Sequence, residues 1–372
     1  DEKTGPGIDY DRNMWRIRSF EAARQVLRAR QQTTQAGFTA EKIPRGYFRH
    51  HPILISDGDD HDGQRREVAR FFAPSVVSAK YGDFISERAQ AVVDGAVAEG
   101  TCRVDDIALA YSVEVTATVV GLTESSVAGM SKRLVGFFKQ PPVDLSAPSM
   151  GRTPRQWMQA AINGLVPIVR FYSADVRPAI RARRAQRHDD VLSHLLDAGY
   201  GTADILVECM TYGTAGMVTT REFISMACWH LLSNDELGRT YREATQPDRL
   251  AILEEIIRLD PVVGHLYRRA QTDIDITDDG RVHTISQGDL IDVCVQQTNA
   301  DPLAMGANPD TACPGRKLKQ GTPAAGLSFS DGAHKCPGQS LALFETDALL
   351  HPLLARRPRI LREPSISWDN LI

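Results

Sequence analysis

The sequence Phe329-Ser-Asp-Gly332-Ala-His334-Lys-Cys336-Pro-Gly338 brings a cysteine, a histidine and two glycines together in one short stretch. Counted from the phenylalanine, the first glycine follows after three residues, the histidine after five, the cysteine after seven and the second glycine after nine. Glycine lets a backbone approach a flat ligand closely, and a cysteine thiolate is a strong metal ligand. The spacing therefore predicts a loop that holds a ligand at the sulfur of Cys336.

The residues that follow the loop predict a helix. Pro337 suits the first turn of a helix over the apolar run from Gln339 to Leu354, which places Cys336 at its N-terminus. There the free N–H groups and the helix dipole favour a thiolate over a thiol. The alternative is that Cys336 is only a small buried hydrophobic residue. Five residues in one pattern favour the ligand.

The composition is that of an ordinary globular protein. Of the 372 residues, 42% are hydrophobic and 24% are charged, the formal net charge is -4 and the pI is about 6.2. Acidic and basic residues are interspersed, so the chain has no basic field to hold nucleic acid. We therefore expect no nucleic-acid partner.

The cysteines and the apolar runs bear on the cellular setting. The six cysteines form no C-x-x-C pair, which argues against a zinc ribbon or a disulfide framework. A reducing, cytoplasmic setting fits this pattern better. No run approaches the ~18 apolar residues of a membrane helix, and the start of the chain carries no signal pattern. We therefore expect no membrane partner.

Helical periodicity dominates the chain. Residues 81–122 and 124–180 each carry at least two helical patterns, and another helix follows Pro247 and ends before Pro261. Short strands are expected near Trp15 and between residues 267 and 295. Many helices with a few strands and no alternation of the two predict one mainly α-helical domain with small β-sheets, over residues 1–372.

The segment from Thr202 to Leu232 is apolar nearly all round, as expected for a helix through the middle of a large protein. Ala215 and Gly216 leave room for a flat cofactor beside its backbone. The hydroxyls of Thr219 and Thr220 can bond back to a carbonyl or open the helix to water, so a local distortion is expected. Close packing of helices at the small residues is the alternative.

Two short motifs carry charged side chains at helical spacing. His61 and Arg65 are four residues apart, on one face of a helix that Pro74 helps to end. Glu255 and Arg258 are three apart, and on an exposed helix such an ion pair contributes only ~0.2 to 0.5 kcal/mol. Solvated helix faces are the alternative for both pairs.

Taken in order, these motifs resemble those of the cytochromes P450, the haem-thiolate oxygenases. The resemblance runs from Trp15 to about Pro358 and implies the cytochrome P450 fold, haem b (iron protoporphyrin IX) as cofactor, and monooxygenase activity. It gives Cys336 the role of iron ligand, and it makes Glu255 and Arg258 a pair that ties the core beneath the haem. The resemblance assigns haem binding to His61, Arg65, Arg268, Phe329, Gly332, His334 and Gly338.

The long helix departs from the family pattern at one position. The family has a small residue, glycine, any residue, an acid and threonine, which Ala215, Gly216 and Thr219 match. Val218 stands where the acid is expected, and Thr220 follows the matching threonine. The resemblance implies that the acid and the threonine deliver protons during oxygen activation. Valine cannot carry a proton, so an atypical proton supply is expected.

The resemblance also implies the partners: a small-molecule substrate, O2, and two electrons from outside. The chain has no Gly-rich nucleotide-binding turn and no clustered cysteines, so it carries no flavin or iron–sulfur module of its own. A separate ferredoxin or flavodoxin with its reductase is expected as the donor. A cluster that could dock an acidic carrier comprises Arg66, Arg70, Arg316, Lys317, Lys319 and Lys335, with solvated surface charges as the alternative.

Two rival functions stay open. One keeps the haem but couples substrates oxidatively or uses peroxide, which Val218 suggests. The other is a helical ligand-binding or scaffold protein without haem. Candidates for the pocket lining include Phe38, Tyr47, Phe48 and residues 262–264, and the Pro-rich stretch 140–154 is either a lid or a long connection.

Overall fold

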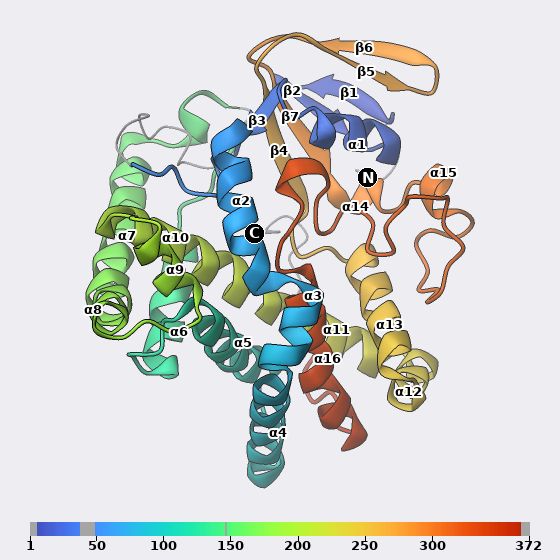
Figure 1. Cartoon of the computed structure of the whole chain (residues 1–372). Helices are drawn as coiled ribbons and strands as arrows, with labels where there is room; N and C mark the ends of the chain where they lie inside the picture. The colour runs from blue at the N-terminus through green and yellow to red at the C-terminus, as the bar shows by residue number, and fades with distance from the viewer. Residues whose placement is uncertain (1–5, 38–48, 146, 366–372) are drawn as a thin grey trace. The chain divides into compact units, whose positions relative to one another are not determined.

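The computed structural model describes residues 6–37, 49–145 and 147–365 (Figure 1). Phe38, Tyr47 and Phe48, which we expected to face a ligand, lie outside these residues. Internal contacts divide the described chain into two compact units. The first unit comprises residues 6–37, 57–63 and 223–365, and the second comprises residues 49–56, 64–145 and 147–222. The single domain over residues 1–372 stays a prediction.

The first unit contains both sheets. A five-stranded sheet has the order β1-β2-β7-β4-β3, and β5 and β6 form a separate antiparallel pair. Only β2 and β7 run parallel; the other neighbours in the larger sheet are antiparallel. The elements are β1 (Ile8–Asp11), β2 (Met14–Ile17), α1 (Phe20–Arg28), β3 (Thr33–Gln35), α12 (Asp235–Glu243), α13 (Gln246–Leu259), β4 (His265–Ala270), β5 (Ile274–Asp278), β6 (Arg281–Ile285), β7 (Leu290–Cys294), α14 (Val295–Thr298), α15 (Pro302–Met305), η8 (Gly332–His334) and α16 (Gln339–Ala355).

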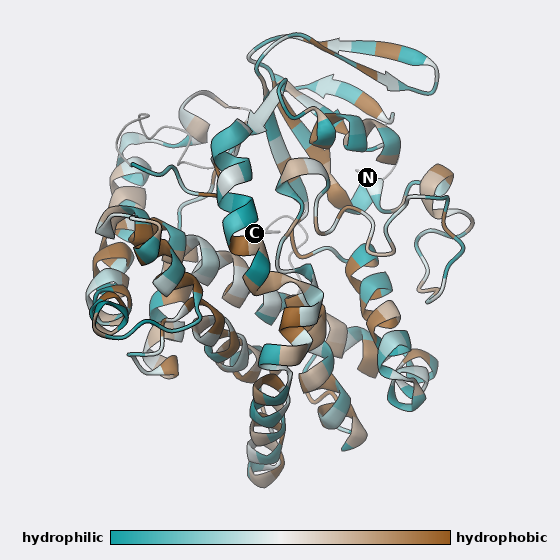
Figure 2. Cartoon of the chain, viewed as in Figure 1, coloured by the Kyte–Doolittle hydropathy of each residue, from teal (hydrophilic) through white to brown (hydrophobic). Residues whose placement is uncertain are grey.

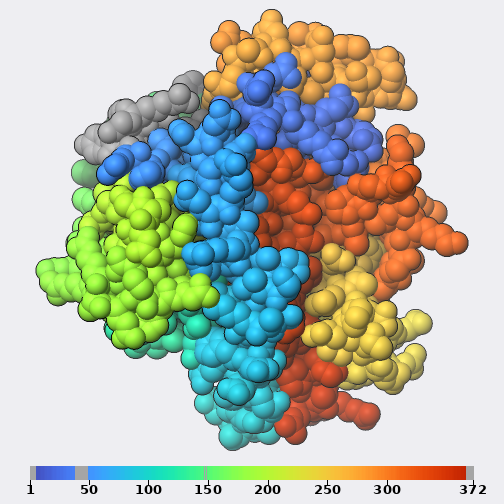
Figure 3. All heavy atoms as spheres, in the orientation of Figure 1, coloured from blue at the N-terminus to red at the C-terminus, as the bar shows by residue number. Residues whose placement is uncertain are grey.

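The core of the first unit forms between the larger sheet and α1. Ile17 on β2 and Val293 on β7 are partners in register, and both belong to the buried cluster that includes Phe20 and Val26 of α1. Gln25 of α1 also exchanges two hydrogen bonds with the backbone of β5, at 2.8 and 3.0 Å. Figure 3 shows the resulting close packing of the orange β5–β6 pair on the blue N-terminal elements. The helix α1 is therefore fixed on two sides.

The second unit is entirely helical in its described part. The apolar helix α5 (Val104–Val120) is buried over most of its length, and Figure 2 shows hydrophobic residues along it. The helices α2 (Gly58–Phe72) and α11 (Thr219–Ser233) belong to both units, because the division falls within them. The other elements are α3 (Pro74–Val76), η3 (Val77–Tyr81), α4 (Gly82–Glu99), α5 (Val104–Val120), α6 (Val127–Val135), η4 (Gly136–Phe138), η5 (Pro148–Gly151), α7 (Pro154–Phe171), η6 (Tyr172–Val176), α8 (Arg177–Ala185), α9 (Val191–Asp197), α10 (Thr202–Tyr212) and η7 (Gly213–Val218).

The long apolar segment is one continuous helical stretch with a distorted centre. It runs through α10, the π-helical η7 and α11. Thr219 and Thr220 donate hydrogen bonds from their hydroxyls to the carbonyl oxygens of Ala215 and Gly216, the latter at 2.7 Å. The predicted distortion is therefore present where the small residues and threonines meet, and π-helical turns of this kind are common at functional sites.

The start of α16 differs from the prediction. The helix begins at Gln339 with Gly338 as its N-cap, so Pro337 precedes the helix and does not form its first turn. Cys336 lies two residues before the N-cap, in the turn that leads into α16. Within the described residues, no helix is long and apolar enough to cross a membrane.

Candidate active site

The loop from Phe329 to Gly338 closes on itself through the backbone. The N–H of Cys336 donates to the carbonyl oxygen of Phe329 at 2.8 Å, and the N–H of Lys335 donates to that of Gly332 at 3.2 Å. The Phe329 side chain is buried at 9% exposure, which anchors the start of the loop. Residues 329 and 336 are thus held side by side, and the cysteine position is fixed by main-chain contacts.

Charged residues of α1 fix the middle of the loop. Asp331 accepts from Arg24 Nε at 3.1 Å, from Arg28 Nε at 3.0 Å and from the N–H of Gly332 at 2.7 Å. Burial alone raises the pKa of the Asp331 carboxyl, but the Gly332 N–H and the two guanidinium groups outweigh burial and hold this pKa below its ordinary value. The loop is therefore tied to an element about 300 residues earlier in the chain.

Glycine is required at position 332 for a different reason from the one we expected. Its φ is +68°, and a β-carbon at this position would lie 2.4 Å from the carbonyl oxygen of Leu27. The close approach is thus to α1 of the same unit, and any side chain would push the loop away from it. Gly338 is less constrained, because a β-carbon there would lie 3.9 Å from Cys336 Sγ, an ordinary contact.

Two of the predicted haem-binding histidines come together. The ring centroids of His61 and His334 are 4.0 Å apart, and His334 Nε2 lies 3.0 Å from Asp57 Oδ1. His61 is buried, with 2% of its side chain exposed. The sequence does not predict the contact between Asp57 and His334, because an aspartate just before a helix is ordinary and nothing local links the two residues. The two imidazoles of this unit can serve one anionic ligand.

Arg268 is a third side chain of the first unit that can bind an anionic ligand. It is 3% exposed, and its Nη1 donates to Gln35 Oε1 and, at 2.8 Å, to the carbonyl oxygen of Tyr267. Among the residues that the structure describes, no carboxylate forms an ion pair with it. Burial lowers the pKa of Arg268 to about 10, although the charge of Asp57 acts in the opposite direction. A buried guanidinium without an ion-pair partner fits an anionic group such as a haem propionate.

Glu255 and Arg258 form a buried ion pair, so the alternative of a solvated helix face does not apply to them. Arg258 Nε and Nη2 lie 2.7 and 2.8 Å from the two carboxylate oxygens of Glu255, and the side chains are 1% and 6% exposed. Arg258 Nη1 also donates to the carbonyl oxygen of Asn299 at 2.7 Å. The pair therefore links α13 to the irregular segment that follows α14.

Arg316 belongs to this network, so its predicted place in a docking cluster is wrong. Its side chain is 7% exposed and its Nε lies 3.3 Å from Glu255 Oε1. Its guanidinium also donates to four carbonyl oxygens between residues 305 and 311. No local pattern predicts this role, because Arg316 stands in a run of basic residues. The rejected cysteine, Cys313, is exposed, and its N–H donates to Glu255 at 3.0 Å.

The remaining predicted site residues lie in the second unit or at its boundary helix. Val218 is 2% exposed and purely apolar, so the position of the expected acid holds no proton donor. Gly216 packs against α5, where a β-carbon would lie 3.1 Å from Thr116 Cγ2. Arg65 follows one turn after His61 on α2 but is counted with the second unit. The roles of Ala215, Gly216, Thr219, Thr220 and Arg65 stay predictions.

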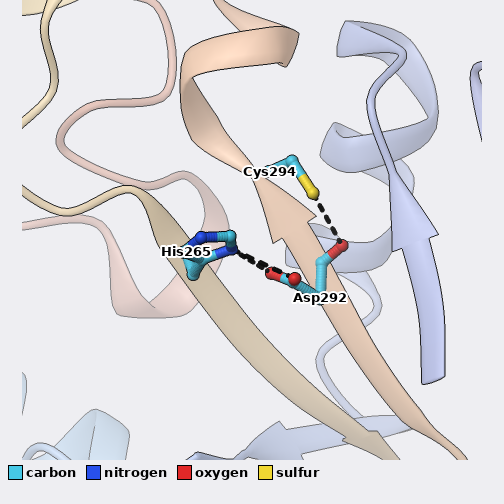
Figure 4. A group of neighbouring side chains, drawn as sticks. All are labelled: His265, Asp292 and Cys294. Atoms are coloured by element: carbon cyan, nitrogen blue, oxygen red, sulfur yellow. Dashed lines mark hydrogen bonds and ion pairs between the residues drawn. The ribbon is translucent and has the colours of Figure 1, made fainter. Parts of the chain in front are cut away.

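A separate group of potential metal ligands lies in the larger sheet. Figure 4 shows His265 of β4 beside Asp292 and Cys294 of β7, with His265 Nδ1 at 2.9 and 3.0 Å from the carboxylate oxygens of Asp292. One ligand atom from each residue lies within 4.8 Å of the others. The residue types suit zinc. The imidazole, however, already satisfies the buried carboxylate, so hydrogen bonding within the sheet accounts for the group.

Comparisons with known proteins point to one family. A family model described as cytochrome P450 matches residues 250–356. The chain is 26% identical to the plant-inducible cytochrome P450-pinF1 of Rhizobium radiobacter over 321 residues, which cover 84% of this chain and 70% of that protein. It is 23% identical to a steroid C26-monooxygenase of Rhodococcus jostii (strain RHA1) over 367 residues, which cover 94% of this chain and 71% of that protein.

The fold agrees with these relatives. The structure superposes on a crystal structure of P450BioI in complex with acyl carrier protein ligated to hexadec-9Z-enoic acid, with a TM-score of 0.74 and 22% identity. The match covers 94% of this chain and 87% of that chain. The predicted fold class, mainly α-helical with small β-sheets, is confirmed. The family model, the named relatives and the fold all support a cytochrome P450 monooxygenase, a family whose members bind haem b through a cysteine thiolate.

Proposed function

We propose that Cys336 is the thiolate ligand of haem b and that the enzyme inserts one oxygen atom of O2 into a small organic substrate. The observation that carries this proposal is the set of groups gathered in the first unit. They are the closed cysteine loop, the neighbouring imidazoles of His61 and His334, and the buried Arg268, which has no ion-pair partner among the described residues. The donor set matches a planar ligand with one metal and anionic edges.

The spectrum of the reduced, carbon-monoxide-bound protein tests the ligand. We expect the band typical of thiolate-ligated haem. Titration with candidate substrates should then convert water-bound low-spin iron to high-spin iron, which identifies ligands that enter the pocket. A protein that binds no haem at all would favour the rival scaffold function.

The residues of the chain have tasks that follow from their chemistry. Haem with a thiolate ligand supplies electron density that favours O–O cleavage. His61, His334 and Arg268 would neutralise the propionates and so fix the orientation of the ring. Ala215 is exposed on the long helix and leaves space beside its backbone, whereas Gly216 allows the close packing against α5. The hydroxyls of Thr219 and Thr220 can hold and pass protons.

Val218 gives a test of the proton supply. We expect Val218→Asp to change the division of electrons between product and released peroxide, with less peroxide because a carboxyl group can pass a proton where valine cannot. Product and peroxide formed per NADPH consumed measure the division. Val218→Asn is the control, because it has the same shape as Asp but carries no titratable proton. Equal division in the wild type and Val218→Asp would remove position 218 from the proton supply.

The same position motivates a second candidate function. Without an acid at residue 218, the haem could serve oxidative coupling or oxidation by peroxide instead of oxygen insertion. Products that form faster with peroxide alone than with an electron donor would favour this alternative.

We propose that the electrons come from a ferredoxin or flavodoxin with its reductase, since P450 monooxygenases of this kind need a redox partner. In the first unit, Lys317, Lys319 and Lys335 are exposed basic residues that could dock an acidic carrier. Arg316 does not contribute, because its guanidinium is buried on Glu255.

Reversing two of these charges tests the docking surface. We expect Lys317→Glu with Lys319→Glu to slow electron transfer at low salt by about 10-fold or more, because charge complementarity accelerates association. Added salt should reduce the difference. Stopped-flow reduction of the haem by the carrier measures the rate, and Lys139→Glu, an exposed lysine of the second unit, is the control. A rate that is the same in all three proteins would place the docking surface elsewhere.

The substrate class is proposed from the relatives. One relative is named for a steroid and the matching structure holds a fatty acid on acyl carrier protein. We therefore propose a mainly apolar molecule of lipid or natural-product type. We also propose that the enzyme works in the reducing cytoplasm, since none of the six cysteines forms a disulfide in the described structure.

A further inference from the structure

Glu208 on α10 is a buried carboxyl group with an unsatisfied oxygen. Its Oε1 accepts from the N–H of Ile53 at 2.8 Å, whereas Oε2 has no hydrogen-bond partner among the described residues. No basic side chain in this part of the chain forms an ion pair with it. Burial raises the pKa of Glu208 to about 7; the Ile53 N–H lowers it and Asp204 raises it further. This acid therefore exchanges its proton near neutral pH.

Tyr212 stands one turn later on the same helix, with a second unsatisfied polar atom. The side chain is 8% exposed, its ring lies 5.9 Å from that of Phe72, and its hydroxyl has no partner among the described residues. Residues four apart lie on one helix face. Two buried polar atoms on one face, each lacking a partner, are commonly joined by an ordered water molecule.

The same face continues through the distorted helix. Four-residue spacing leads from Glu208 and Tyr212 to Gly216 and then to Thr220, whose hydroxyl donates to the Gly216 carbonyl at 2.7 Å. Beside Gly216 stands Thr116 of α5, with its Oγ1 3.2 Å from where a β-carbon would lie. This hydroxyl also has no partner in the described structure. Three unsatisfied polar atoms, on Glu208, Tyr212 and Thr116, thus belong to or lie beside the helix segment that carries the threonines.

We propose that Glu208 is the acid that stores the proton for the Thr219–Thr220 segment, in place of the acid missing at Val218, and that Tyr212 and Thr116 pass it on. The proposal rests on the proposed function, because only an oxygenase needs this supply. In this role Glu208 supplies the proton through other residues and does not itself touch the substrate.

The transfer balances without any redox change. The O–H bond of the Glu208 carboxyl breaks as its proton moves to the bridging water, and Tyr212 accepts a proton from that water while it gives up its own. The proton then reaches the hydroxyls of Thr116 and Thr220. The carboxylate left at Glu208 regains a proton from solvent at the exposed N-terminal end of α10, near Gly201.

Other titratable and charged groups lie around Glu208. Cys209 and Tyr212 of the same helix, and Tyr200 of the preceding loop, all have pKa values raised by burial. Asp204 accepts hydrogen bonds from the N–H groups of Arg49 and Gly201, and Arg65 of α2 acts on Tyr212 by its charge. Tyr212 therefore stays a neutral hydroxyl while it passes protons.

The competing explanation is structural: Glu208 would only fix the backbone at Ile53, as Asp204 fixes Arg49. Glu208→Gln separates the two roles, because the amide oxygen can still accept from Ile53 but the side chain carries no exchangeable acid proton. Tyr212→Phe removes the relay hydroxyl and keeps the ring on Phe72. Tyr111→Phe is its control, since Tyr111 is another buried tyrosine of this unit whose hydroxyl donates to Ile85.

Infrared difference spectra of the ferric, haem-loaded protein across neutral pH give a readout independent of turnover. We expect a protonated carboxyl band that disappears with a midpoint near pH 7 and is absent in Glu208→Gln. In turnover, Glu208→Gln and Tyr212→Phe should release more peroxide and form product more slowly, by about 100-fold for Glu208→Gln. The double variant Glu208→Gln/Val218→Asp should recover product formation.

Three results would overturn the proposal: no titrating carboxyl band, a band that persists in Glu208→Gln, or unchanged peroxide release in both single variants. If Glu208→Gln loses its haem, the titration of the wild-type carboxyl band and the peroxide release of Tyr212→Phe still test the proposal. Failure of the proposed function is a different result, since it appears as a wild-type carbon-monoxide spectrum without the thiolate band.

Discussion

Replacing Cys336 with serine is expected to abolish the thiolate-haem band of the reduced, carbon-monoxide-bound protein and to lower turnover by more than about 100-fold. Loss of groups that merely support a metal ligand already costs 10- to 100-fold in many enzymes, and loss of the ligand itself should cost more. The backbone of the loop should survive, because the Cys336 N–H, not its sulfur, bonds to Phe329. The spectrum and product formation measure the two effects.

Cys313→Ser is the matched control for this change. Cys313 also precedes a proline and a glycine, but it is exposed and lacks the phenylalanine, glycine and histidine at the earlier positions. We expect this variant to keep the band and the activity. If the band instead survived in Cys336→Ser and vanished in Cys313→Ser, the ligand assignment would be wrong.

Local patterns in the sequence predicted the elements well. Helical periodicity gave α4, α5 and the long run through α10, η7 and α11, and the threonines after small residues indicated the distortion that the structure places at η7. These features depend on neighbours within one or two turns, which spacing records directly.

The sequence could not predict what depends on contacts between distant segments. Gly332 is required by the Leu27 carbonyl of α1, and Asp57 holds His334 across most of the chain. Arg316 looked like one more surface cation, but it is buried on Glu255. Residue type and spacing are the same for a solvated and a buried charge, so burial had to come from the fold.

The second unit contains a similar case. Glu208 stands in an apolar helix, where the sequence gives no sign of whether a carboxylate faces solvent or the interior. Its carboxyl group is buried, with one oxygen on the N–H of Ile53 and the other unsatisfied. Glu208 is therefore the group that we propose in place of the acid expected at position 218. The departure at Val218 was visible in the sequence, whereas the group that could compensate for it was not.

Replacing Glu255 with alanine is expected to lower the free energy of unfolding by about 3 to 5 kcal/mol, because it leaves a buried cation without a counter-ion. Glu255 is in contact with both Arg258 and Arg316, so its loss leaves two guanidinium groups uncompensated. Domains of ordinary stability have only about 5 to 15 kcal/mol in total. Urea unfolding and the yield of haem-loaded protein measure the effect.

Asp197→Ala is the control, because it removes an ion pair of the same N–O distance that is exposed instead of buried. Arg187 Nε lies 2.7 Å from Asp197 Oδ1, the same distance as Arg258 Nε from Glu255 Oε2, but these side chains are 40% and 61% exposed. Water screens that pair and already solvates both charges, so its loss should cost at most about 1 kcal/mol. Equal costs for the two substitutions would mean that the arginines find other partners when Glu255 is removed. A large difference would show that burial makes the contribution of the Glu255–Arg258 pair to the free energy of unfolding large. The three-residue spacing alone does not reveal this burial.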